Sequence, residues 1–245
     1  MGVLVYPVLF VGGFFTGILS GISGGGGGML LIPFMIALGL PPQQAVATGK
    51  LSGLGAAFGG LSAFWKSGNV RKDILKIMAP VAIVIGIATP FIFIHIDGEI
   101  MAKVIGVLLI ALMPTLFIRK GIGSAKSRVQ KDIGYFLYGG VLTMQSLFGA
   151  GVGSLALFVL TLFLGTTKLQ ANATKRAVTA ILTPLSFIGL FAAGFVRLDY
   201  GLAAVGGSFI GTRIGSKIAL REGETFVTYA MAIIVTVSGV LLLVS

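Results

Sequence analysis

Long apolar segments separated by short polar connections make up almost the whole chain. A helix needs about 20 residues to cross the hydrocarbon core of a bilayer. Apolar runs near that length cover residues 3–19, 44–65, 74–94, 100–118, 135–147, 171–195, 200–218 and 226–244. The pattern predicts an all-α polytopic membrane protein with little chain left for a soluble domain.

Two apolar segments are too short to cross. Met29–Leu38 and Leu155–Leu164 are about ten residues each, half of a membrane-spanning helix, and each follows a glycine-rich stretch. We interpret each as part of a glycine-broken or re-entrant helical hairpin, in which the chain unwinds near the midplane. Non-helical backbone is tolerated at that depth only where protein or a water-filled cavity satisfies its polar groups.

The short segments belong to a longer repeat. The pattern that runs from Ser20 to Lys50 recurs 126 residues later, from Ser146 to Arg176. Without a gap, the second copy repeats the residue types of Ser20, Gly25, Gly27, Leu31, Leu38, Gly39, Gln44, Ala45, Ala47, Thr48, Gly68, Val70, Arg71 and Asp73. We predict an internal duplication with a first repeat over 1–119, a basic linker over 120–131 and a second repeat over 132–245. Each repeat holds one broken hairpin and about three membrane helices.

Charge distribution predicts the orientation of the spans. Lysine and arginine mark cytoplasmic loops, and they concentrate in 66–76, 119–131 and 213–221, whereas 39–43, 95–103 and 194–200 hold fewer. Placing the first set inside puts both termini outside and inverts the two repeats.

Composition excludes several classes of function. The chain is 56% hydrophobic and 10% charged, with a mean hydropathy of +1.05, far from a soluble domain. The net charge of +11 lies mostly in connections between spans, so the expected partner is the lipid bilayer and not a nucleic acid.

We expect no cofactor. There is no cysteine, and all the carboxylates fall at span ends or in loops, which argues against a metal site. No nucleophile, general base and orienting acid lie at spacings that would form a catalytic site, so we do not expect an enzyme.

Lys50 and Arg176 are the candidate binding cations. Each lies one to two turns inside a long apolar run, where a charge costs about 3 kcal/mol and usually marks function. The alternative is that they extend to nearby lipid headgroups. Recurrence at matching repeat positions favours a shared anion site. The neighbouring Lys175 faces another side of its helix, and we interpret it as the side chain that reaches the headgroups.

Donors for the same anion are predicted around the glycine breaks. Backbone N–H groups freed there, with the positive ends of the following short helices, attract an anion without adding a full charge. The candidate backbone donors are Gly24, Gly25, Gly26, Gly27, Gly149, Gly151 and Gly153, and the candidate side-chain donors are Ser23, Thr48, Thr174, Gln145 and Asn172.

These motifs resemble the TauE/SafE sulfite exporter family, also described as the toluene sulfonate uptake permease group. The resemblance rests on residues 21–33, Gly39 with 45–48, the second copy at 149–153 and 171–174, and the small-residue run 206–215. It implies a multi-pass permease of a prokaryotic inner membrane, built of two inverted halves, that moves sulfite or organosulfonates. Ala150 and Val152 replace two glycines of the first copy, which departs from a symmetric site.

The sequence therefore predicts a permease or exporter of small anions that works by alternating access around a midplane site. A passive anion channel, or a membrane binding or assembly subunit that does not transport, are the alternatives. A homo-oligomer is left open.

Overall fold

The computed structural model describes residues 5–24, 28–97, 128–149 and 152–244, without the side chains of 28–30, 154, 224–225 and 227–244. The predicted span 100–118, most of the predicted linker 120–131 and the candidate donors Gly25, Gly26, Gly27 and Gly151 lie outside these residues. The described chain is helical, with no strand.

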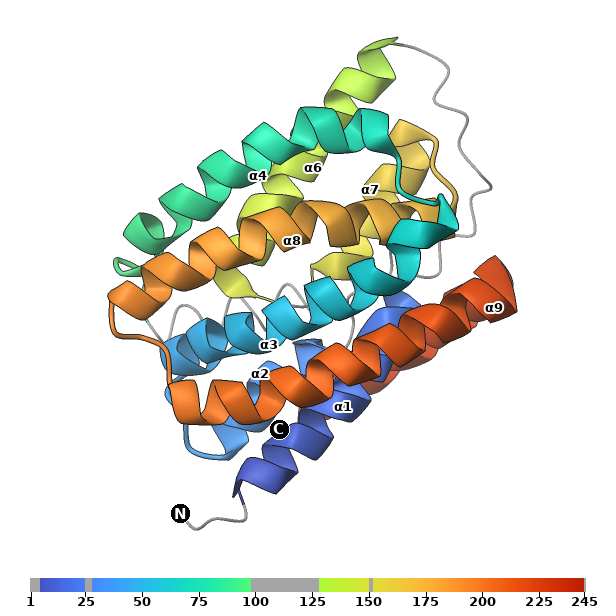
Figure 1. Ribbon diagram of the computed structural model, residues 1–245. Helices are drawn as coiled ribbons and strands as arrows, with labels where there is room; N and C mark the ends of the chain where they lie inside the picture. The colour runs from blue at the N-terminus through green and yellow to red at the C-terminus, as the bar shows by residue number, and fades with distance from the viewer. Residues whose placement is uncertain (1–4, 25–27, 98–127, 150–151, 245) are drawn as a thin grey trace.

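The helices follow the apolar runs closely (Figure 1). They are α1 Val5–Ser23, α2 Gly28–Ala37, α3 Pro42–Phe64, α4 Lys72–Phe93, α6 Arg128–Phe148, α7 Gly153–Leu164, α8 Lys168–Ala192 and α9 Leu198–Val244, with a short 3₁₀ turn Trp65–Ser67 after α3. The predicted short segments are confirmed as the short helices α2 and α7. Two boundaries differ from the prediction. α6 begins at Arg128 and not near residue 135, because exposed polar residues continue its helix, and α9 joins two predicted spans across a non-helical Gly223.

A membrane environment explains the apolar outer surface. Within the described residues, α1, α4 and α8 are each long and apolar enough to cross a bilayer. Val84 and Phe91 of α4 are 67% and 69% exposed. Lipid stabilises such a continuous apolar surface, which a soluble monomer rarely exposes. The chain is a multi-pass all-α membrane protein.

The helices pack as two bundles that do not follow the order of the sequence. α9 packs along α1 and α3, while α4 packs along α6 and α8 (Figure 1). One buried apolar cluster is formed mainly by α4, α6, α7 and α8, and the other mainly by α1, α2, α3 and α9. Each predicted half therefore gives helices to both bundles, and α3 against α8 joins the bundles.

Glycines bring α1 and α9 close together. Gly13, Gly17 and Gly21 of α1 face the backbone of α9, and a Cβ added to Gly17 would lie 2.8 Å from the Ser208 carbonyl oxygen. Gly211 and Gly215 of α9 face the backbone of α1 in return. These small residues therefore let the two helix backbones approach closely, as is typical of membrane helices.

Candidate functional site

A cavity of about 90 Å³ lies where the two bundles meet. α1, α3 and α8 supply most of its wall, α2 adds Leu31 and Ile32, and α9 adds Ser208. The ends of α6 and α7 contribute at the second glycine break. Its polar lining consists of Thr16, Ser20, Lys50, Ser52, Gln145, Lys175, Arg176, Thr179, Thr183 and Ser208. The wall thus combines basic, hydroxyl and amide groups.

Three basic side chains lie in this wall. Lys50, Lys175 and Arg176 are only 6%, 3% and 4% exposed. Among the described residues, the ion pairs are formed by surface arginines and none involves these three cations. An isolated buried charge is costly unless it is paired or hydrogen-bonded. The cavity therefore brings three basic side chains together inside an apolar protein.

Backbone carbonyls at the two helix breaks hold the lysines. The Lys50 ammonium donates to the Gln145 carbonyl at 3.1 Å and to the Ser146 carbonyl, both in the last turn of α6. Lys175 donates to the Gly24 carbonyl just beyond α1. The C-terminal end of a helix carries unsatisfied carbonyls and partial negative charge, which a cation stabilises.

Arg176 makes the matching contacts to α1. Its Nη2 donates to the Ser20 carbonyl and, at 3.1 Å, to the Ser20 hydroxyl, while Nη1 donates to the Ala56 carbonyl at 3.2 Å. Its Nε has no partner among the described residues, although it is buried. Gly60 makes room for this side chain, since an added Cβ would lie 2.9 Å from Arg176 Cδ.

Glycine conformation creates the breaks. Gly24 and Gly149 have φ of +77° and +85°, in the left-handed region that glycine tolerates best. A Cβ on Gly24 would also lie 2.5 Å from Leu157 Cδ1, so a larger residue there clashes with α7. α1 and α6 therefore stop, and α2 and α7 start, at the centre of the structure.

The cavity contains some predicted site residues and leaves others out. Lys50, Arg176, Gln145, Gly149 and Gly153 line it together. The Asn172 side chain donates to the Gly21 carbonyl at 3.1 Å, and the Ser23 hydroxyl donates to the Leu19 carbonyl at 2.7 Å. These two donors, and Gly24, stabilise the first break and are not part of the cavity wall.

Thr48 and Thr174 also lie outside the wall. Each hydroxyl accepts a backbone N–H at 3.0 Å: Thr48 from Arg197 and Thr174 from Arg71. Each contact joins the start of α9 or α4 to the cation-bearing helix of the other half.

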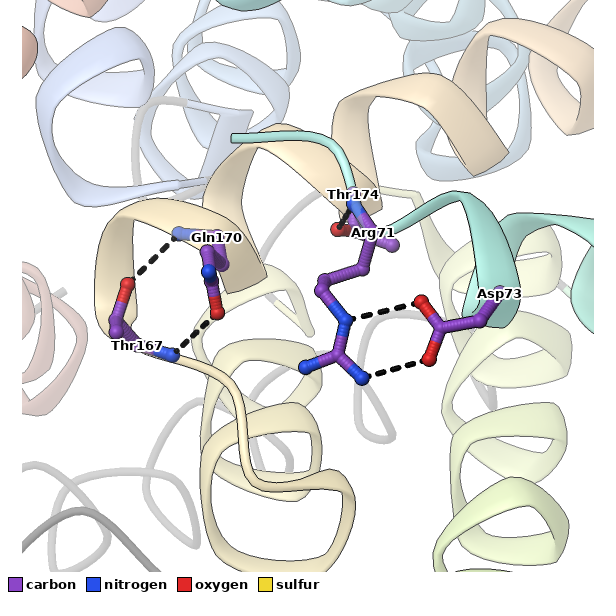
Figure 2. Close-up of polar contacts among 5 residues, drawn as sticks. All are labelled: Arg71, Asp73, Thr167, Gln170 and Thr174. Atoms are coloured by element: carbon purple, nitrogen blue, oxygen red, sulfur yellow. Dashed lines mark hydrogen bonds and ion pairs between the residues drawn. The ribbon is translucent and has the colours of Figure 1, made fainter. Parts of the chain in front are cut away.

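Bidentate ion pairs flank these two contacts. Arg71 binds Asp73 through Nε and Nη2, at 2.9 and 2.6 Å (Figure 2), and Arg197 binds Asp199 in the same way. The hydrogen bond to Asp73 raises the pKa of Arg71 above its ordinary value. Figure 2 also shows the Thr167 and Gln170 capping box that begins α8, next to the Thr174 contact.

Sequence reasoning missed part of the lining. The interpretation of Lys175 as a headgroup-facing side chain is wrong, because the side chain is buried and bonded to the first break. Thr179 and Thr183 follow Arg176 at helical spacings of three and seven, a signal that could have found them. Ser20, Ser52 and Ser208 carry no such signal. Within the described residues, no group of histidine, cysteine and carboxylate side chains could hold a metal ion.

Comparison with known proteins adds the family. Probable membrane transporter proteins are similar over almost their full length: one from Haemophilus influenzae is 26% identical over 234 residues, 93% of this chain and 90% of its own. One from a Sinorhizobium species is 28% identical over 242 residues, 92% of this chain and 87% of its own. No solved structure matches. The model of the sulfite exporter TauE/SafE family matches residues 9–242, and the chain belongs to this family of membrane transporters.

Proposed function

We propose that the protein transports a small anion, sulfite or an organosulfonate, across a prokaryotic inner membrane by alternating access. The observation that carries the proposal is that Lys50 and Arg176, one from each predicted half, line the same buried cavity. The termini lie outside and the basic segment 66–76 lies inside, as the distribution of basic loops predicts.

The basic side chains in the cavity wall favour an anionic ligand. Buried cations without a described carboxylate partner attract an anion and repel a metal ion. The planar guanidinium can donate parallel hydrogen bonds to two oxygens of one oxyanion, and hydroxyl groups in the wall add donors. The family supports sulfur oxyanions as the substrate class.

Repeat-related contacts support inverted halves. α3 and α8 begin at Pro42 and Lys168, and α4 and α9 begin at Lys72 and Leu198, each pair separated by the offset of the sequence repeat. α3 and α8 run in opposite directions (Figure 1). A two-fold axis in the membrane plane would produce this arrangement, which is common in alternating-access transporters.

The cation contacts repeat in the same way. Lys50 binds the Ser146 carbonyl and Arg176 binds the Ser20 carbonyl, so the equivalent cations bind equivalent serines across the axis. Each half therefore supplies a cation to the broken helix of the other, and a relative movement of the halves changes both contacts together.

Uptake into protein-containing vesicles tests the proposal. We expect sulfite flux that saturates, competes with excess unlabelled sulfite, and falls at least about 10-fold in Lys50→Met and in Arg176→Met, since each loses a full charge in a low-dielectric site. Lys66→Met, which removes an exposed cation, is the matched control.

Other results would favour the alternatives. Flux that stays linear with concentration and shows no competition would identify a passive channel. Absence of flux from folded protein for every anion tried would point to a binding or assembly subunit.

A further inference from the structure

Lys175 gives the central cavity a third cation that has no repeat-related counterpart. The equivalent position in the first half is Gly49, which also lines the cavity. Lys175 is only 3% exposed, and its ammonium donates to the Gly24 carbonyl. The two halves are therefore alike in Lys50 and Arg176 but differ in charge one residue earlier.

The cavity wall lacks a compensating negative charge among the described residues. Lys50, Lys175 and Arg176 bind carbonyl oxygens, which supply only partial charges. The broken helices contribute two C-terminal and two N-terminal ends, and their opposite half charges cancel. A bound anion favours the protonated forms of all three side chains. Together these carry a charge of +3, so a doubly charged ligand is stabilised more than a singly charged one.

An unpartnered donor also points to a ligand. The buried Nε of Arg176 has no acceptor among the described residues. A buried donor without an acceptor is costly and is usually satisfied by water or a ligand.

We propose that the site takes one dianionic oxyanion and that Lys175 is the residue that selects two charges over one. The proposal rests on the proposed anion transport and specifies the charge of its substrate. The Coulomb energy between the Lys175 ammonium and a dianion is about twice that between the ammonium and a monoanion of the same shape.

Anion pairs of equal shape and different charge provide the test. Sulfite and chlorate are both pyramidal, and sulfate and perchlorate are both tetrahedral. Binding of each is measured by titration calorimetry on the purified full chain, at a pH where sulfite carries two charges. In the pair whose shape fits the site better, we expect wild-type protein to bind the dianion (sulfite or sulfate) at least about 10-fold more tightly than the monoanion (chlorate or perchlorate).

Two variants assign this selectivity to Lys175. Lys175→Met keeps the length of the side chain without the charge, and the preference for the dianion should fall about 10-fold, mainly through weaker dianion binding. Lys175→Arg should keep the preference. If the methionine variant does not fold, the wild-type preference and its retention in Lys175→Arg still test the claim.

The outcomes separate this inference from the function on which it rests. Equal binding of dianion and monoanion by wild-type protein, or an unchanged preference in folded Lys175→Met, would overturn the charge selection while anion binding itself stands. Folded wild-type protein that binds none of the four anions would overturn both.

Discussion

Individual side chains show where sequence reasoning succeeds and where it stops. Lys50 and Arg176 are predictable because each cation interrupts an apolar run and recurs in the second copy. The position of Lys175 is not predictable in this way. The direction of its side chain on the helix does not show that the helix break at Gly24 lies in that direction. Thr48 and Thr174 recur as well, yet their hydroxyls bind the backbone of Arg197 and Arg71. Recurrence therefore identifies residues where the predicted halves meet without separating those that line the cavity from those that only join the halves.

Gly60 offers a direct test of the Arg176 position. Gly60→Ala places a methyl group against Arg176 Cδ and displaces the guanidinium. We expect sulfite binding to weaken about 10-fold, a change of about 1.4 kcal/mol, without loss of folding, because alanine favours the helix. Gly140→Ala is the control, since an added Cβ there has no heavy atom within 4 Å. Unchanged binding in folded Gly60→Ala would contradict the assigned role of Arg176.

Helices are the level at which the sequence predicts best. The lengths of the apolar runs predict the bounds of α1, α3, α4 and α8 closely. The glycine-rich stretches, each followed by a short apolar segment, predict the short helices α2 and α7. The start of α6 is missed because its first turns carry Arg128, Lys131 and Asp132, which favour solvent and remain helical. Apolar content locates the crossing part of a helix but not its polar extension.

The Thr48 and Thr174 contacts are expected to stabilise closure at opposite ends of the molecule. A single cysteine at Ala57, in the cavity wall, can be labelled without background because the chain has no cysteine. Thr48→Val removes the acceptor for Arg197, and labelling by a membrane-impermeant thiol reagent should rise from the outside. Thr174→Val removes the acceptor for Arg71, and labelling should rise from the inside.

Thr143→Val is the control for both variants, since the Thr143 hydroxyl donates only within its own helix, to the Gly139 carbonyl at 3.1 Å. Equal labelling from both sides in all three variants would mean that these contacts do not govern access.

The packing of α1 on α9 is expected to be sensitive to a single methyl group. In Gly211→Ala the new Cβ meets the Phe14 carbonyl of α1. Overpacking of this kind costs about 2 kcal/mol, so Tm should fall by several degrees relative to Gly140→Ala. A Tm equal to that of the control would show that the two backbones are less closely packed.

The whole molecule is the least predictable level. The repeat predicts two halves, but the bundles mix them, because α4 packs on α6 and α8, and α9 packs on α1 and α3. This exchange places Lys50 at the second break and Arg176 at the first. No local pattern encodes it, because the contacts are far apart along the chain: Lys50 and Ser146 are separated by 96 residues, and Arg176 and Ser20 by 156.

The proposed orientation can be checked in intact cells. Ser67 and His95 are exposed at opposite ends of α4 and its preceding turn. In single-cysteine variants, an impermeant thiol reagent should label His95→Cys in intact cells and Ser67→Cys only after the cells are opened. The reverse pattern would invert the orientation and place the termini inside.

The central claim is that Lys50 and Arg176 form one anion site. Equilibrium binding of sulfite to the purified protein tests it most directly, with Lys50→Met, Arg176→Met and the exposed control Lys66→Met measured beside the wild type. The account predicts one saturable site, weakened at least about 10-fold in each cavity variant and unchanged in the control. Equal binding by all four folded proteins would contradict it.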